Sequence, residues 1–248
     1  MWVWALLSLL MSVGRAETAD EIIARARAAN QVSSSIQNLR MTITRGASSR
    51  TRDLVLKSRR EADGTVKTRM DVAAPSDVAG TKLLMIQRPN VPIEQYVYLP
   101  ATKRLNRLAG SQRTGNFLGS DFNYEDLEFR SAAEGSRSVT AETPTEWEIT
   151  TVTPEGSSYS KVVVHMDKTD LIAKKVEFFD RKTGTLAKEL LVNKIEKDRA
   201  RNVPVETQMR NLKGGKDWST TITIQSHQYD VGKDVLPDDT FTPQALEN

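Results

Sequence analysis

The side chains best suited to proton transfer are two histidines, His165 and His227. Each stands at the polar phase of an alternating segment, and neither has an obvious acidic neighbour in the sequence to orient its ring. The chain also lacks the G-x-S-x-G turn that would present a nucleophilic serine. Both histidines are therefore expected to be solvated or hydrogen-bonded strand residues.

Three carboxylates, Asp121, Glu125 and Asp126, lie close enough in sequence to supply the acid pair of a glycoside hydrolase. The same residues also fit a structural role, with Ser120 or Asp121 capping a short helix that begins at Phe122 and the two later acids in its first turn. Acids at a helix start are usually caps, so the sequence favours a protein that is not an enzyme. A hydrolase using this acidic set remains an alternative.

Composition excludes several other classes of site. The chain has no cysteine, which removes disulfides, thiol nucleophiles and cysteine-bound metals, and two histidines are too few for a His-rich metal cluster. No Gly-rich phosphate loop occurs. The 35 Lys and Arg against 32 Asp and Glu are near balance, unlike the basic stripe of a nucleic-acid-binding protein. We therefore predict no metal, no cofactor and no nucleic-acid partner.

A basic cluster without intervening acids lies between Glu94 and Asp121. Such a patch could attract phospholipid headgroups or an acidic partner. It could equally be a solvated strand edge whose charges discourage edge pairing. Its members are Lys103, Arg104, Arg107 and Arg113.

The segment from Ala109 to Arg130, AGSQRTGNFLGSDFNYEDLEFR, holds three glycines and much of the aromatic content of the chain. A segment of this kind inside a regular β protein is a candidate lid or plug, with Gly115 and Gly119 as hinges around Phe117–Leu118. The alternative is an ordinary corner that packs into the core.

The rest of the chain must position these residues, and most of it alternates apolar and polar side chains with a period of two. Tight turns separate roughly ten or eleven such segments, one of them at Pro100–Lys103. Few helix-length segments intervene, so consecutive antiparallel hairpins are expected in a mainly β (α+β) protein. A sheet of this many strands curls rather than staying flat.

The N-terminus predicts export. Residues 1–16, MWVWALLSLLMSVGRA, read as a signal peptide cut after Ala16, although no Lys or Arg precedes the apolar run. An uncleaved anchor is the alternative, but the run is short of the roughly 20 residues that span a bilayer. An amphipathic helix is predicted over Glu17–Asn30. The mature protein, 17–248, is expected to be a soluble periplasmic domain.

Three segments carry a family resemblance: GTKLLMIQRPN (80–90), QYVYLPATKRLNRLAGSQRTGNFLGSDFNYEDL (95–127) and LPDDTFTP (236–243). They resemble the LolA-like family of outer-membrane lipoprotein-sorting proteins, with FLGSDFxYEDL as the most specific motif. The resemblance implies an open half-barrel of about 11 antiparallel strands, of the LolA/LolB/RseB type. Helices would cover its concave face and leave an apolar hollow.

The resemblance also implies roles for the motif residues. Phe117, Leu118, Phe122, Tyr124 and Leu127 would face the hollow. Gly115, Gly119, Ser120, Asp121, Glu125 and Asp126 would fix the lid. The basic cluster would contact headgroups or a partner.

Taken together, the resemblance implies a periplasmic carrier of lipid, lipoprotein acyl chains or another hydrophobic molecule. Transport would run toward the outer membrane, and an RND-type inner-membrane transporter is an implied partner. No lipid-attachment cysteine is present, so the chain resembles a soluble carrier rather than an anchored acceptor. The competing hypothesis is a partner or sensor module that binds no ligand and docks on a transporter or lipoprotein.

Overall fold

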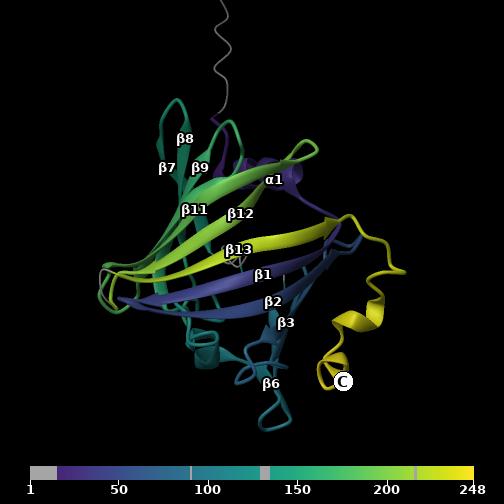
Figure 1. Cartoon of the computed structure of the whole chain (residues 1–248). Helices are drawn as coiled ribbons and strands as arrows, with labels where there is room; N and C mark the ends of the chain where they lie inside the picture. Colours follow the sequence, from purple (N-terminus) through teal and green to yellow (C-terminus); the bar gives the residue numbers. More distant parts are fainter. Residues whose placement is uncertain (1–15, 90, 129–134, 215–216) are drawn as a thin grey trace, which may run out of the picture.

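The computed structural model describes residues 16–89, 91–128, 135–214 and 217–248 (Figure 1). Its strands form one open antiparallel sheet in the order β6-β5-β4-β3-β2-β1-β13-β12-β11-β10-β9-β8-β7. The strands are β1 (Ser34–Arg45), β2 (Ser48–Arg60), β3 (Val66–Ala74), β4 (Lys82–Gln87), β5 (Glu94–Leu99), β6 (Arg104–Leu108), β7 (Ser136–Glu142), β8 (Glu146–Val152), β9 (Tyr159–Asp167), β10 (Ala173–Asp180), β11 (Leu186–Asp198), β12 (Arg201–Asn211) and β13 (Trp218–Tyr229).

The prediction of a curved antiparallel sheet is confirmed, but the prediction of about 11 strands is wrong. The described residues form 13 strands, and the two that the periodicity missed are β6 and β7, the two edges of the sheet. An edge strand has one neighbour and little apolar surface to bury, so its alternation is weak. The sequence of β6 is RLNRL, and β7 reads SRSVTAE with Val139 as its one large aliphatic residue.

Alternating side chains divide the sheet into two covered faces. In β4, Leu83 and Met85 join a cluster on the concave face, whereas Leu84 and Ile86 join a cluster on the outer face. Both faces of this strand are buried, which explains its continuous apolar run KLLMIQ. Figure 1 shows the sheet curving around the helix and loops that cover its concave side.

One α-helix, α1 (Ala19–Asn30), occurs in the described part of the chain, so the expectation of several helices on the concave face is wrong. A capping box starts it: the Thr18 side chain accepts from the Glu21 backbone N–H, and Glu21 accepts from the Thr18 N–H. Its apolar side, including Ile22, packs against Trp147 and Ile149 of β8. Another part of the concave face is covered by a loop rather than by helices.

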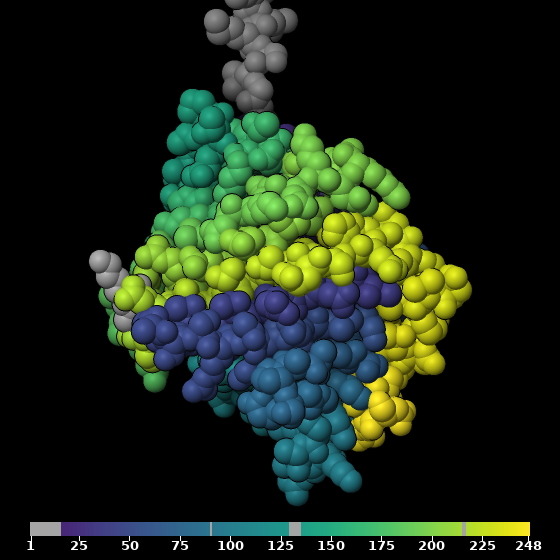
Figure 2. All heavy atoms as spheres, viewed as in Figure 1, coloured from purple at the N-terminus to yellow at the C-terminus, as the bar shows by residue number. Residues whose placement is uncertain are grey.

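The C-terminal segment after β13 covers the outer face of β3–β5. Leu236, Phe241 and Leu246 are buried there against Leu84 and Ile86, partly through two short 3-10 helices, η3 (Asp238–Phe241) and η4 (Gln244–Leu246). Figure 2 shows this segment in yellow against the blue strands.

Arg59 of β2 fixes the same segment to the sheet. Its guanidinium donates to the Leu236 carbonyl at 2.7 Å and pairs with Asp238, while its own side chain is 5% exposed.

The predicted signal peptide lies almost entirely outside the described residues. Residues 1–15 of the expected signal peptide 1–16 are among those the structure does not describe. Within the described ranges, none of the helices has the length and hydrophobicity needed to cross a membrane.

Candidate functional site

The predicted lid lies on the concave face of the sheet. We call residues 115–128 the lid; they follow a 3-10 helix, η1 (Gly110–Thr114). Phe117, Phe122 and Leu127 are 1%, 0% and 3% exposed and belong to the cluster formed by concave residues of β1–β5, β11 and β12. Tyr124 meets Phe117 edge to face at 5.7 Å, and both Tyr124 and Leu118 are part-buried. The expected unfilled hollow is therefore wrong here, because the lid's own side chains occupy it.

The lid is a small hairpin rather than a capped helix. Phe117 N–H donates to the Phe122 carbonyl at 2.8 Å, and Asn116 and Asn123 form an antiparallel bridge. Leu118 and Gly119 turn the chain with φ values of 52° and 71°. Ser120 is buried, and its hydroxyl accepts from the Phe122 N–H at 3.2 Å. Phe122 and Asn123 are extended because they pair with Phe117 and Asn116, so the prediction of a helix that begins at Phe122 is wrong.

Of the two expected hinge glycines, only Gly119 has the left-handed backbone that favours glycine. Gly115 has φ −70°, which any residue adopts.

An ion pair holds the tip of the lid to the middle of the sheet. Asp121, whose side chain is fully buried, accepts from Arg45 of β1 at 2.8 Å and from the Thr220 hydroxyl of β13 at 2.7 Å. The Asp121 N–H donates back to that hydroxyl at 3.0 Å. Asp121 is therefore a fastening rather than a helix cap.

A second buried network holds the other limb of the lid. Asp126 accepts from Lys188 of β11 at 2.9 Å and from the Tyr159 hydroxyl of β9 at 2.7 Å. It also accepts from the Asn123 N–H, and Lys188 donates to the Asn123 side chain at 3.0 Å. Burial, followed by the charge of Asp126, raises the pKa of Tyr159 well above its usual range, so the phenol stays a donor.

Weaker contacts surround these two fastenings. Glu125 accepts from the Ser157 hydroxyl at 3.1 Å and from the Ser158 N–H, and the Gln95 amide donates to the Tyr124 carbonyl at 2.9 Å. The lid thus covers an apolar face of the sheet, and hydrogen bonds and ion pairs between its polar groups and those of the sheet hold it there.

The predicted basic cluster does not form one surface. Lys103, Arg104 and Arg107 are exposed on the β5–β6 hairpin at the sheet edge. Arg113 lies apart from them in η1 and pairs with the fully buried carboxylate of Glu128. Arg113 is therefore part of the lid's support. Glu128, which fixes η1 to the lid, was not singled out from the sequence because no spacing relates it to Arg113.

The lid leaves part of the apolar wall accessible. Leu56, Val176, Phe178, Ile222 and Ile224 pack against the same cluster but are only part-buried. They lie on β2, β10 and β13. The concave face therefore combines a covered region with part-exposed apolar side chains on β2, β13 and β10, and we call these five residues the apolar strip.

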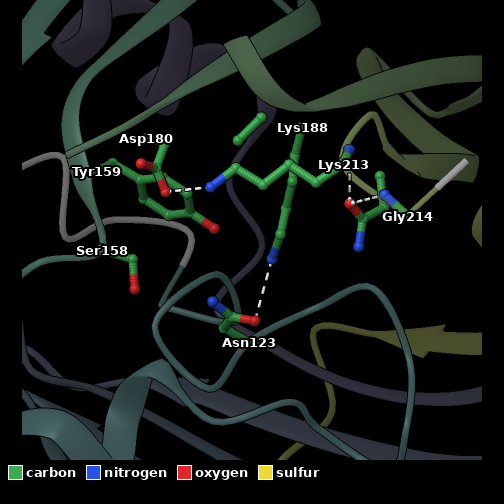
Figure 3. Close-up of a pocket in the computed structure, with 9 residues that line it drawn as sticks. Asn123, Ser158, Tyr159, Asp180, Lys188, Lys213 and Gly214 are labelled. Carbon is green, nitrogen blue, oxygen red and sulfur yellow. Dashed lines mark hydrogen bonds and ion pairs between the residues drawn. The ribbon is translucent and has the colours of Figure 1, made fainter. Parts of the chain in front are cut away.

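A pocket of about 290 Å³ opens where the lid meets the ends of β9, β10, β11 and β12 (Figure 3). Its lining is mixed, with two lysines, one aspartate and several neutral polar groups: Asn123, Ser158, Tyr159, Asp180, Ala187, Lys188, Asn211, Lys213 and Gly214. We call it the mouth pocket. It adjoins the apolar strip, since the rings of Tyr159 and Phe178 lie 5.0 Å apart.

His165 lies away from the lid and is a hydrogen-bonded strand residue. Its Nδ1 lies 3.0 Å from Glu146 Oε1 and its Nε2 lies 3.2 Å from Glu177 Oε2. Sequence inspection missed both carboxylates because they come from the neighbouring strands β8 and β10. The described residues contain no group of three or more acidic or histidine side chains placed to hold a metal.

His165 should make stability depend on pH. Burial opposes its charge, but hydrogen bonds to Glu146 and Glu177 and their charges raise its pKa above 6.5. Its stabilisation is fully present below pH 6.5 and is lost as pH rises through the raised pKa. Between pH 6 and 9 the melting temperature of wild type should fall by about 1–3 °C more than that of His165→Gln. The difference is small because solvent partly screens the interaction of the histidine with the two carboxylates. Parallel pH profiles from calorimetry would contradict this.

The curved antiparallel sheet, with one α-helix in the described residues, is the fold of a solved domain of the lipoprotein-sorting class, which confirms the resemblance. A family model described as "Uncharacterized protein" matches residues 64–248, and the chain belongs to that family. A comparison with curated proteins found no match.

Solved structures give the closer comparison. A candidate outer membrane lipoprotein-sorting protein domain from Vibrio parahaemolyticus is 27% identical, with a TM-score of 0.82 over 92% of this chain and 97% of its own. A DUF1329 family protein from Desulfovibrio piger has a TM-score of 0.82 at 24% identity, covering 91% and 96%. A LolA superfamily protein from Nitrosomonas europaea has a TM-score of 0.68 at 15% identity, covering 92% and 98%. The last two show the fold alone.

Proposed function

We propose that this chain is a periplasmic carrier that binds an acyl chain or another hydrophobic molecule on the concave face of its sheet, beneath a lid that opens. The observation that carries the proposal is the lid itself. Phe117 and Phe122 cover an apolar wall, yet buried polar pairs rather than strand pairing with the sheet attach the segment. Such a segment can leave as a unit without breaking the sheet.

The energetics support exchange of the lid for a guest. Removing Phe117 and Phe122 from the wall would expose apolar surface, which an incoming chain covers again at about 0.8 kcal/mol per buried CH₂. The part-exposed strip beside the lid offers a place where the first carbons of a guest can settle. Lid opening would then follow as the chain advances.

The family resemblance extends the proposal to delivery toward the outer membrane, with lipid, lipoprotein or a hydrophobic small molecule as cargo. An RND-type inner-membrane transporter is the proposed partner. The similar domain from Vibrio parahaemolyticus, designated for lipoprotein sorting, supports this class of role.

Two adjacent phenylalanines of β10 give a matched test. Phe178 belongs to the concave strip, whereas Phe179 lies under Lys161 Nζ, 4.3 Å from its ring centroid. Phe178→Asn should weaken binding of the fluorescent fatty acid cis-parinaric acid about ten-fold or more, the cost of one lost aromatic contact. Phe179→Asn should change it less than two-fold. Equal effects, or no binding by wild type, would refute the proposal.

A second candidate function is a partner or sensor module without a ligand, favoured by the exposed charges of the β5–β6 hairpin. Edge strand β6 has an unpaired side, and Arg104 and Arg107 project from it. In that case partner capture would survive Phe178→Asn but fail in Arg104→Glu, Arg107→Glu.

A further inference from the structure

The mouth pocket places two ammonium groups beside the apolar strip. Lys188 comes from β11 and Lys213 from the loop after β12, and one carboxylate, Asp180, lines the pocket with them. Figure 3 shows both lysine side chains entering the pocket, Lys213 toward Asp180 and Lys188 toward Asn123. Tyr159 also lines the pocket, and its hydroxyl group donates to Asp126, the same carboxylate that pairs with Lys188. The pocket therefore presents donors at the end of an apolar surface.

Lys213 can turn from its present partner toward a second anion, because its side chain is 50% exposed. Its partner Asp180 is 17% exposed, and the hydrogen bond from Lys213 is the main cause that lowers the pKa of Asp180 to about 2. Asp180 does not depend on Lys213 alone, because its other oxygen accepts from the backbone N–H groups of Lys182 and Thr183 at 3.0 and 2.9 Å. The Lys213 ammonium group is thus free to turn toward an anion that enters the pocket.

Lys188 is different, because its partner is a fastening of the lid. Its side chain is 10% exposed and its counter-ion, Asp126, is fully buried. Separating such a pair without replacement is strongly unfavourable, since each charge would be left uncompensated. An anion that takes the place of Asp126 beside Lys188 removes that penalty for the lysine. The lid carboxylate can then return to water as the lid lifts.

We propose that the mouth pocket binds the anionic head, a phosphate or carboxylate, of an amphiphile, and that this head replaces Asp126 as the counter-ion of Lys188 and so releases the lid. The inference rests on the proposed function and specifies its cargo. The head binds between Lys188 and Lys213, and the tail continues past Tyr159 onto Phe178. A neutral molecule of the same length lacks the charge that unfastens the lid.

Three probes separate the head from the tail: n-dodecyl phosphate, n-dodecanol and inorganic phosphate, each titrated below its critical micelle concentration where it has one. Wild type should bind dodecyl phosphate at least ten-fold more tightly than dodecanol and at least 100-fold more tightly than inorganic phosphate. Dodecyl phosphate should also speed hydrogen exchange in the lid. Lys213→Met should reduce the preference over dodecanol to about two-fold.

Lys182→Met is the matched control, since Lys182 is an exposed lysine of the neighbouring turn that does not line the mouth pocket. It should keep the full preference. Equal binding of dodecanol and dodecyl phosphate would overturn this inference and leave the carrier proposal standing. Inorganic phosphate binding as tightly as dodecyl phosphate would make the pocket a site for the free anion and overturn it as well. If neither dodecyl phosphate nor dodecanol bound, the carrier proposal itself would be refuted.

Discussion

Oxidation of an Asp121→Cys, Thr220→Cys variant is expected to abolish binding of cis-parinaric acid, by at least 100-fold, and reduction should restore it. Asp121 N–H lies 3.0 Å from the Thr220 hydroxyl, so the two Cα atoms are at most about 7 Å apart, within reach of a disulfide. The chain has no native cysteine, so the new pair is the only one that can form. A covalent bond at the tip of the lid keeps Phe117 and Phe122 over the wall.

The control for this lock is an Asp121→Ser, Thr220→Ser variant under the same oxidant. It loses the ion pair between Asp121 and Arg45 without gaining a covalent bond, so it should bind at least as tightly as wild type. If the oxidised cysteine variant bound the probe as well as its reduced form, a guest would not need the lid to open. The carrier would then have to use the part-exposed strip alone.

Replacing Asp126 by alanine is expected to cost about 3–5 kcal/mol, because it leaves the buried ammonium group of Lys188 without a counter-ion. The molecule can escape part of this cost by releasing the lid, which lets water reach Lys188. Hydrogen exchange should therefore accelerate strongly in the lid and little in β1 or β13. Chemical denaturation and exchange mass spectrometry measure the two effects.

A double variant separates charge from shape. Asp126→Ala with Lys188→Met removes both charges and should recover most of the lost stability, since no unpaired ion remains. The exposed pair Arg40–Asp53 is the matched surface comparison, and Asp53→Ala should leave stability unchanged within error. If Asp126→Ala were as stable as wild type and exchanged no faster, the buried network would not be what fastens the lid.

The sequence was most informative for strands that bury the side chains of one face and expose those of the other. The alternation of Leu39, Met41 and Ile43 predicts a strand with one apolar face, and these three side chains are indeed buried on the concave side. It was least informative at the edges, where β6 and β7 bury too little for a pattern to develop. The lid was identifiable from its glycines and aromatics, but its hairpin geometry was not, because Leu118 adopts a left-handed backbone that residue type does not signal.

The fastenings of the lid illustrate a further limit. From the sequence alone, the positions of Asp121 and Asp126 predict acids at the start of a short helix. Their partners lie far away in the chain: Thr220 is 99 residues from Asp121, and Lys188 is 62 residues from Asp126. Only the order of strands in the sheet brings these residues together, and no local spacing encodes it.

Under the proposed carrier function, the separation of the two edge strands bears on the range of molecules that the concave face can hold. β6 and β7 stand at opposite ends of the strand order and are not hydrogen-bonded to each other. A closed barrel would have to break backbone hydrogen bonds in order to widen, whereas this sheet can flatten or tighten with every ladder intact. The sheet can then adjust to ligands of different width by bending alone. The number and branching of a ligand's acyl chains should therefore restrict binding less than they would in a closed barrel.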